Sequence, residues 1–418
     1  MSSSGFSRRR LIAGTAAATA GALAGGALLT ACDDDSAAGS DASSSVTAPT
    51  RVDFEGRHQP GITTPPPRHA IVAAFDVTAS DRDELGAMFQ AATAEARDLM
   101  AGVPAPARSK LLPPVDNLIV GVEPPPDALT ITVGVGASLF DDRYGLRDRR
   151  PEQLVAMPAF PNDEPHEDQS HGDVVVQVCA STPEGCNHAL RRVMRVTRDS
   201  LTLRWMLPGF QEPNSLGPGR ASGRNLMGFK DGTANPNSTD TTLMDELVWV
   251  AGGDGEPAWA VDGSYMVVRR IRMRVEFWDR TALHTQEAII GRFKDTGAPL
   301  DGVYETDLPV YAADPDGAQT PLTAHIRLAN PRTERTEKNR ILRRGFNFSQ
   351  GFTPDGQLDQ GLLFVCFQRN LADGFMSVQS RLNGEALEEY IKPVGGGFFF
   401  ALPGVRGPSG YLGESMLA

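Results

Sequence analysis

The chain has 418 residues, of which 40% are hydrophobic, enough to build a substantial core without disulfide staples. Aromatic residues make up 7%, charged residues 22%, and the mean hydropathy is -0.25, values that argue against a membrane bundle or a disordered chain. The formal net charge of -12 argues against nucleic acid as a partner. Its simplest explanation is that a net charge keeps the protein soluble.

The first 31 residues predict an export signal. Residues 7–12 (SRRRLI) form a twin-arginine motif, and a weakly apolar stretch follows to Leu29 that is short for a spanning helix. Residues 29–32 (LTAC) match a lipobox, in which cleavage before Cys32 leaves its thiol free for lipid attachment; simple cleavage nearby is the alternative. We expect twin-arginine export of a folded chain and a membrane-surface lipoprotein held through Cys32.

Residues 32–67 predict a flexible tether, because Asp, Ser, Ala, Thr and Pro dominate and large apolar residues are almost absent. Residues 68–215 then predict an N-terminal domain of strand, helix, two strands, helix and strand. Ser80 is a candidate cap for the first helix and Thr182 for the second. The predicted strands are His69–Val77, Leu129–Val135, Asp173–Cys179 and Leu201–Leu207.

Residues 216–418 predict a second domain of the same kind. Alternating residues from Tyr265 to Phe277 indicate a half-buried strand, and a helix is expected over about Arg280–Arg292. Gly361–Gln368, a helix after Asn370 and Phe398–Leu402 complete the repeat. The expected fold class is therefore α+β, with two ferredoxin-like domains whose antiparallel sheets resemble a dimeric α+β barrel.

Three cysteines remain after Cys32. Cys179 and Cys186 lie seven residues apart, so a disulfide is one possibility and two separate core thiols are the other. The chain has no CxxCH sequence, which excludes the covalent c-type haem signature.

Three segments carry the densest functional signal. They are residues 228–236 (GFKDGTANP), 324–332 (AHIRLANPR) and 341–345 (ILRRG). Together with residues 136–141 (GASLFD), 160–163 (FPND), 171–173 (HGD) and 395–400 (GGGFFF), they resemble the dye-decolourising peroxidase family over roughly residues 68–410. The resemblance is strongest to the twin-arginine-exported subfamily associated with bacterial iron uptake, whose members are also called deferrochelatases.

The resemblance implies one non-covalent haem b per chain, bound in the C-terminal half, with His325 as the axial ligand of the iron. A ferric haem needs one strong donor from the protein, and a neutral imidazole supplies it in peroxidases. The other six histidines fit this role less well, since two lie in or beside the predicted tether and two on predicted helices. A metal site at His166 and His171 is disfavoured, because their spacing does not put both on one helix face.

On the opposite face, the resemblance assigns Asp231 as the proton shuttle for hydrogen peroxide and Arg343 as the distal cation. Arg344 is the rival for the second role. Small residues beside Asp231 and a segment after His325 match haem-contacting positions of the family: Gly232, Thr233, Ala234, Asn330, Pro331 and Arg332. Leu362 and Phe364 are expected either in an apolar distal wall or in the core.

A ligating imidazole usually donates its second N–H to an acid. Glu385, Glu388 and Glu389 are the candidates, and the sequence does not choose among them. The leading function is a peroxidase that oxidises dyes, phenols or porphyrinogen-like donors. The alternatives are a deferrochelatase that releases iron from haem, and a lipid-anchored haem carrier without turnover. Homo-oligomers and iron-import partners are expected from the resemblance alone.

Overall fold

The computed structural model describes residues 50–418, so the export signal and Cys32 lie outside the described residues. Helices α1 to α8 span Arg82–Ala101, Pro183–Thr197, Thr241–Leu247, Val275–Trp278, Leu283–Ile290, His325–Ala329, Ser377–Leu382 and Glu414–Leu417. Strands β1 to β6 span His69–Val77, Thr130–Gly136, Val174–Ala180, Leu201–Phe210, Asn214–Gly217 and Arg220–Arg224. Strands β7 to β12 span Lys230–Asp231, Ser264–Met273, Leu342–Arg343, Phe346–Phe352, Leu358–Gln368 and Ile391–Ala401. No helix within residues 50–418 has the length and apolar character that a membrane span requires.

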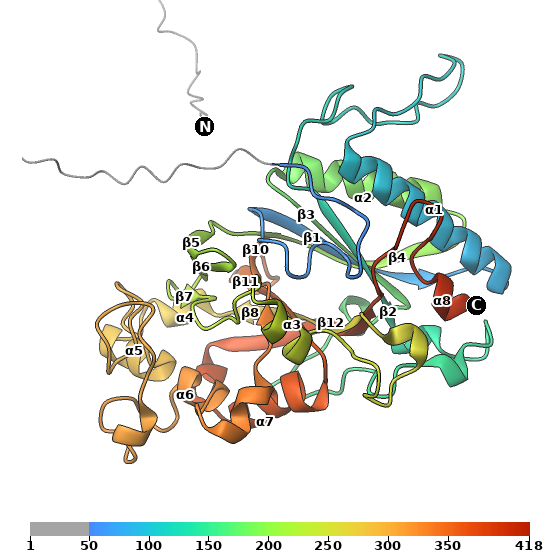
Figure 1. Cartoon of the computed structure of the whole chain (residues 1–418). Coiled ribbons are helices and arrows are strands. Elements are labelled where there is room, and N and C mark those ends of the chain that lie inside the picture. Colours follow the sequence, from blue (N-terminus) through green and yellow to red (C-terminus); the bar gives the residue numbers. More distant parts are fainter. Residues whose placement is uncertain (1–49) are drawn as a thin grey trace, which may run out of the picture. The chain divides into compact units, whose positions relative to one another are not determined.

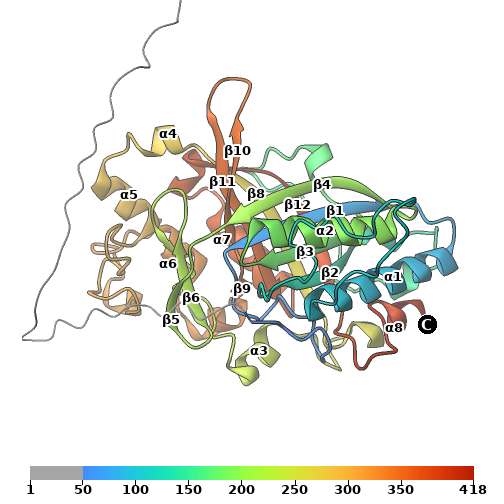
Figure 2. The same cartoon turned by 90° about the horizontal axis from the view of Figure 1, so that it is seen from above.

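Eight antiparallel strands close into a barrel, in the order β10-β4-β1-β3-β2-β12-β8-β11, with β11 pairing back to β10. The N-terminal half contributes β4-β1-β3-β2 and the C-terminal half β10-β11-β8-β12. Each is the strand order of a ferredoxin-like domain, so the expected fold class is confirmed. Figure 2 shows the β10–β11 hairpin projecting beyond the rest of the barrel. The two halves share one sheet, and the described residues 50–418 belong to one compact unit.

The two long helices α1 and α2 pack on each other and on the N-terminal strands (Figure 1). The cap of α1 is one residue later than predicted: the Asp81 side chain accepts from Glu84 N–H, while Ser80 donates to the Glu84 carboxylate. Thr182 caps α2 through Gly185 N–H, as predicted. The three cysteines of the described chain are buried and free, so Cys179 and Cys186 are separate core thiols.

The predicted tether ends earlier than Pro67. Phe54 and Ile62 are buried, and the Gln59 amide donates to the carbonyls of Val133 and Leu402 over 2.7 Å each. The prediction was therefore wrong for residues 50–67, which pack on the barrel. Sequence composition missed this because a few spaced apolar residues and one buried amide hold the segment.

Two element boundaries in the C-terminal half also differ from the prediction. The strand predicted to reach Phe277 ends at Met273. Its pairing with β11 stops at Arg272 and its pairing with β12 at Met273, after which the chain turns into α4. The following helix is shorter than expected and ends at Gly291, which adopts a left-handed conformation with φ 93°. A small three-stranded sheet, β5-β6-β7, was not predicted, and it carries Asp231.

Candidate active site

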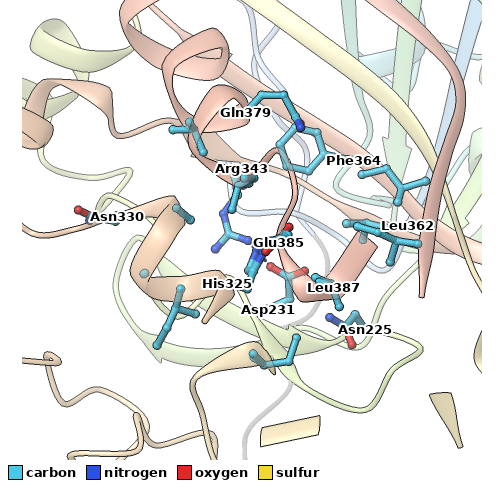
Figure 3. Close-up of a pocket in the computed structure, with 18 of the residues that line it drawn as sticks. Asn225, Asp231, His325, Asn330, Arg343, Leu362, Phe364, Gln379, Glu385 and Leu387 are labelled. Carbon is cyan, nitrogen blue, oxygen red and sulfur yellow. Dashed lines mark hydrogen bonds and ion pairs between the residues drawn. The ribbon is translucent and has the colours of Figure 1, made fainter. Parts of the chain in front are cut away.

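A cavity in the C-terminal half is lined by charged residues from several separate segments together with an apolar wall. Figure 3 shows Asp231, His325, Arg343 and Glu385 converging on it. The predicted residues Gly232, Thr233, Ala234, Asn330 and Arg332 also line this cavity, and Pro331 does not. The apolar wall includes Met227, Phe229, Ile271, Ile290, Ile326, Leu362, Phe364, Phe375 and Leu387.

His325 is the first residue of α6, and this short helix is fixed at both ends. Arg327 donates to the carbonyls of Thr320 and Asp314 over 2.7 Å each, before the helix. Arg381 of α7 donates to the carbonyls of Leu328 and Ala329 over 3.0 Å each, which satisfies groups at the helix C-terminus. The imidazole is therefore presented to the cavity by a supported backbone.

Glu385 is the acid that contacts His325. Its Oε2 atom lies 2.8 Å from His325 Nδ1, and its side chain is only 3% exposed. Because a carboxylate only accepts, Nδ1 carries the hydrogen and Nε2 is left as the donor for a metal. Burial lowers the pKa of His325, but the charge and hydrogen bond of Glu385 outweigh this and hold that pKa above its ordinary value. Glu388 also lines the cavity, whereas Glu389 does not.

Asp231 and Arg343 form an ion pair, in which Arg343 Nη1 donates to Asp231 Oδ1. The two come from strands far apart in the sequence: β7 pairs with β6, and β9 pairs with β11. Arg344, the rival for the distal role, is buried and donates instead to the Thr64 carbonyl. The structure thus brings Arg343, and not Arg344, to the carboxylate.

Asn235 connects the two strands that carry this pair. Its side-chain amide donates to the Arg343 carbonyl over 2.7 Å, and its Oδ1 accepts from Arg343 N–H over 3.1 Å. Asn235 had no predicted role, although it lies in the same segment as Asp231. The sequence did contain a sign of this role, because an Asn side chain a few residues after Asp231 can hydrogen-bond to a neighbouring backbone.

Gly232 allows the chain after Asp231 to turn tightly. Its φ is +106°, and a Cβ at this position would meet the Ala221 carbonyl oxygen at 2.7 Å. The next residue, Thr233, donates to Glu305 over 2.8 Å, and Glu305 also accepts from Ser222 and pairs with Lys230. Glu305 is therefore a second supporting residue that was missed, and no local pattern marks it.

Comparison with known proteins matches these features to one family. The N-terminal model of the Dyp-type peroxidases covers residues 59–211, and their C-terminal model covers residues 222–406. The chain belongs to the Dyp-type peroxidase family. The resemblance inferred from the sequence motifs is confirmed.

The similarity to individual relatives and solved structures extends over most of the length of both chains. Deferrochelatases from Yersinia pseudotuberculosis and Shigella flexneri are each 50% identical over 87% of this chain, covering 84% and 87% of the relative. Two solved structures, a DyP-type peroxidase from Cellulomonas bogoriensis and ferric DtpA from Streptomyces lividans, have TM-scores of 0.78 and 36% identity. They cover 88% of this chain and 98% and 97% of their own.

Proposed function

We propose that this Dyp-type peroxidase binds one haem b and uses hydrogen peroxide to oxidise bulky organic one-electron donors such as dyes and phenols. The observation that carries the proposal is a single cavity lined by both the His325–Glu385 pair and the Asp231–Arg343 pair. A haem carrier needs an imidazole, but it has no use for a carboxylate beside a guanidinium.

The residues around the cavity fit a haem. Nε2 of His325 is free to bind iron, since Nδ1 is engaged by Glu385, and a carboxylate in this position raises ligand basicity. The apolar wall suits a porphyrin plane. Arg332 lines the cavity, and its buried Nε has no hydrogen-bond partner within residues 50–418, so it suits an acidic group of the cofactor. Arg332 also has φ 55°, a strained value typical of functional sites.

Bound haem would supply an iron that takes two oxidising equivalents from peroxide and passes them on singly. The chain's own residues move the proton and balance the charge. Asp231 takes the proton from one peroxide oxygen and returns it to the other, which becomes water as it leaves. Arg343 places a permanent cation beside the developing negative charge, and Asn235 holds the Arg343 backbone in register.

The test is stopped-flow spectroscopy of the haem-loaded protein mixed with peroxide. We expect Asp231→Asn to keep the haem absorption and to slow the first reaction by at least about 100-fold, the lower range for general acid–base catalysis. Asp355→Asn, in the exposed turn between β10 and β11, is the control and should match the parent. Equal rates for Asp231→Asn and the parent would leave a haem-binding protein without this proton shuttle.

The relatives named deferrochelatase favour a second function, release of iron from haem with the porphyrin left intact. The measurement is metal-free porphyrin fluorescence after anaerobic incubation of the haem-loaded chain with a ferrous chelator and a reductant. Iron release predicts a fluorescent product that is lost in His325→Ala. A loss of absorption without that product would indicate ring breakdown instead.

We propose that the chain is exported by the twin-arginine route and anchored to an extracytoplasmic membrane surface through lipid on Cys32. The support is the order of motifs in residues 1–32. Labelling with a fatty-acid analogue should mark the parent and not Cys32→Ser, and Arg8→Lys with Arg9→Lys should retain the precursor in the cytoplasm. Homo-oligomers and iron-import partners are further proposals that the family suggests, and mass measurement and co-purification test them.

A further inference from the structure

The loop between α1 and β2, residues 102–129, projects away from the helices (Figure 1). Several of its apolar side chains are exposed. Leu111 is 94% exposed, the largest value among the exposed large hydrophobic residues of the described chain. The loop's exposed apolar residues are Val103, Leu111, Leu112, Leu118, Ile119 and Val122. We call residues 103–125 the apolar loop. Exposed apolar residues gathered on one projecting segment are typical of an interaction surface.

In the apolar loop one acidic side chain is buried against α2, whereas the basic side chains are exposed. Asp116 is buried, and it pairs with His188 Nε2 at 2.8 Å and with Arg192, both on α2. Arg108 and Lys110 are exposed and directly precede Leu111 and Leu112 in the chain. The tip therefore presents cations and leucines together. Glu123 is the one exposed acid in residues 103–125.

The apolar loop is held in shape without regular secondary structure. Arg195 of α2 donates to the Pro114 carbonyl, and Leu118 N–H donates to Asp116 Oδ1 over 2.6 Å. Prolines restrict the backbone at six positions, Pro104, Pro106, Pro113, Pro114, Pro124 and Pro125. A preformed loop loses less conformational entropy when it binds a surface.

The described chain begins at the base of this loop. The Thr50 carbonyl accepts from Ala128 N–H over 3.0 Å, and Arg51 donates to the Pro124 carbonyl over 2.6 Å. Residues 33–49 separate Cys32 from this point. A chain of that length spans at most about 60 Å. A lipid attached to Cys32 would therefore hold the base of the apolar loop within about 60 Å of a bilayer.

We propose that the apolar loop docks on a bilayer with anionic headgroups, with Leu111 and Leu112 inserted among the acyl chains. Arg108 and Lys110 then lie at headgroup level, where each cation contributes to binding. The remainder of this acidic protein is repelled by the same surface, so the loop also sets the orientation of the enzyme. The inference goes beyond the proposed function, because it requires neither haem nor turnover.

Vesicle sedimentation tests the proposal. Every protein begins at residue 32 and carries Cys32→Ser, so that neither a lipid nor the arginines of residues 8–10 contribute to binding. The parent should bind vesicles of mixed phosphatidylglycerol and phosphatidylcholine more tightly than vesicles of phosphatidylcholine alone. Leu111→Ser with Leu112→Ser should weaken binding to the anionic vesicles at least about tenfold, from the apolar area no longer buried.

A charge variant and a matched control separate the two contributions. Arg108→Gln with Lys110→Gln should abolish the preference for anionic vesicles and its decline with salt. Phe352→Ser removes an apolar side chain that is 77% exposed on the β10–β11 hairpin, and it should bind as the parent does. Unchanged far-UV circular dichroism confirms the fold of each variant.

Three results would overturn the proposal. The parent could bind neutral and anionic vesicles equally, or the leucine variant could bind as tightly as Phe352→Ser. The third is that the leucine variant shifts the protein from dimer to monomer in sedimentation velocity while its vesicle binding is unchanged. That last result would assign the apolar loop to contact between two copies of the chain.

Discussion

Nδ1 of His325 donates to Oε2 of Glu385 across 2.8 Å, and the glutamate that accepts is almost fully buried. A buried carboxylate gives the imidazole partial negative character, which would strengthen the bond from His325 to the iron of a bound haem, the role proposed for it above. His325 and Glu385 come from separate segments after barrel strands β8 and β11, so their contact depends on the folded C-terminal half.

Glu385→Gln should therefore change the electronic properties of a bound haem. The amide can still accept from Nδ1–H, but it carries no charge, so we expect a higher reduction potential of the iron and roughly 10- to 100-fold weaker haem binding. Spectroelectrochemical titration and haem transfer to a competitor protein measure the two quantities. Glu388→Gln is the control, because Glu388 lines the same cavity without bonding His325. Equal potentials in the two variants would argue that Glu385 is only a structural group.

Asn235→Ala should slow the reaction with peroxide while leaving haem binding intact. The variant loses two hydrogen bonds to the Arg343 backbone, so the guanidinium is less firmly placed beside Asp231. A misplacement of about 1 Å can reduce the rate about 100-fold. Stopped-flow rates and haem affinity, measured together, test this.

Asn237→Ala is the control for Asn235→Ala, since the Asn237 side chain bonds locally to Thr239 and the Asn237 carbonyl closes a turn. It should react with peroxide at the parent rate. Weaker haem binding in Asn235→Ala, with an unchanged rate per bound haem, would contradict the positioning role.

Gly232→Ala should lower the free energy of unfolding more than Gly253→Ala, although both glycines have similar positive φ angles. Gly232 and Gly253 have φ values of +106° and +101°, but a Cβ meets the Ala221 carbonyl at 2.7 Å only at the first position. We expect a loss of about 1 kcal/mol at Gly253 from the left-handed conformation alone. The contact should add at least about 1 kcal/mol at Gly232. Urea unfolding of both variants measures the difference, and equal losses would show that the backbone relaxes away from the contact.

The Asp116 carboxylate should make stability depend on pH in the acid range. Burial raises its pKa, but hydrogen bonds from His188, the backbone and Arg192 outweigh this and hold the pKa below its ordinary value of 3.8. A depressed carboxyl pKa contributes stability that is complete above the unfolded value and is lost as pH falls through the folded value.

Asp116→Asn should therefore be less stable than the parent at neutral pH, by about 3 kcal/mol for a broken buried pair. The difference should shrink as pH falls below about 4, because the Asp116 carboxyl of the unfolded chain takes up its proton first and the folded carboxylate follows at a lower pH. Urea unfolding between pH 3 and 7, roughly the range that spans the ordinary carboxyl pKa, measures it. A difference that stays constant over this range would show that the carboxylate charge is not what stabilises the loop.

Local patterns in the sequence accounted for much of the fold. Apolar runs gave β1 its bounds, and the cap at Thr182 began α2 where it was predicted. Motif resemblance selected His325, Asp231 and Arg343 as candidates, and all three line one cavity. The strand bounds, the helix cap and the motif residues could be predicted because each is marked by residues that lie close together in the chain.

Other features depend on long-range contacts and were decided only by the tertiary structure. The choice of Glu385 over Glu388 and Glu389, and the support from Glu305, depend on which backbones meet around the cavity. The end of β8 depends on where two partner strands stop pairing. The sequence by itself determined which chemical groups were available, because motifs and periodicity are local features. The tertiary structure decided which of these groups come into contact, because the barrel joins strands that lie hundreds of residues apart.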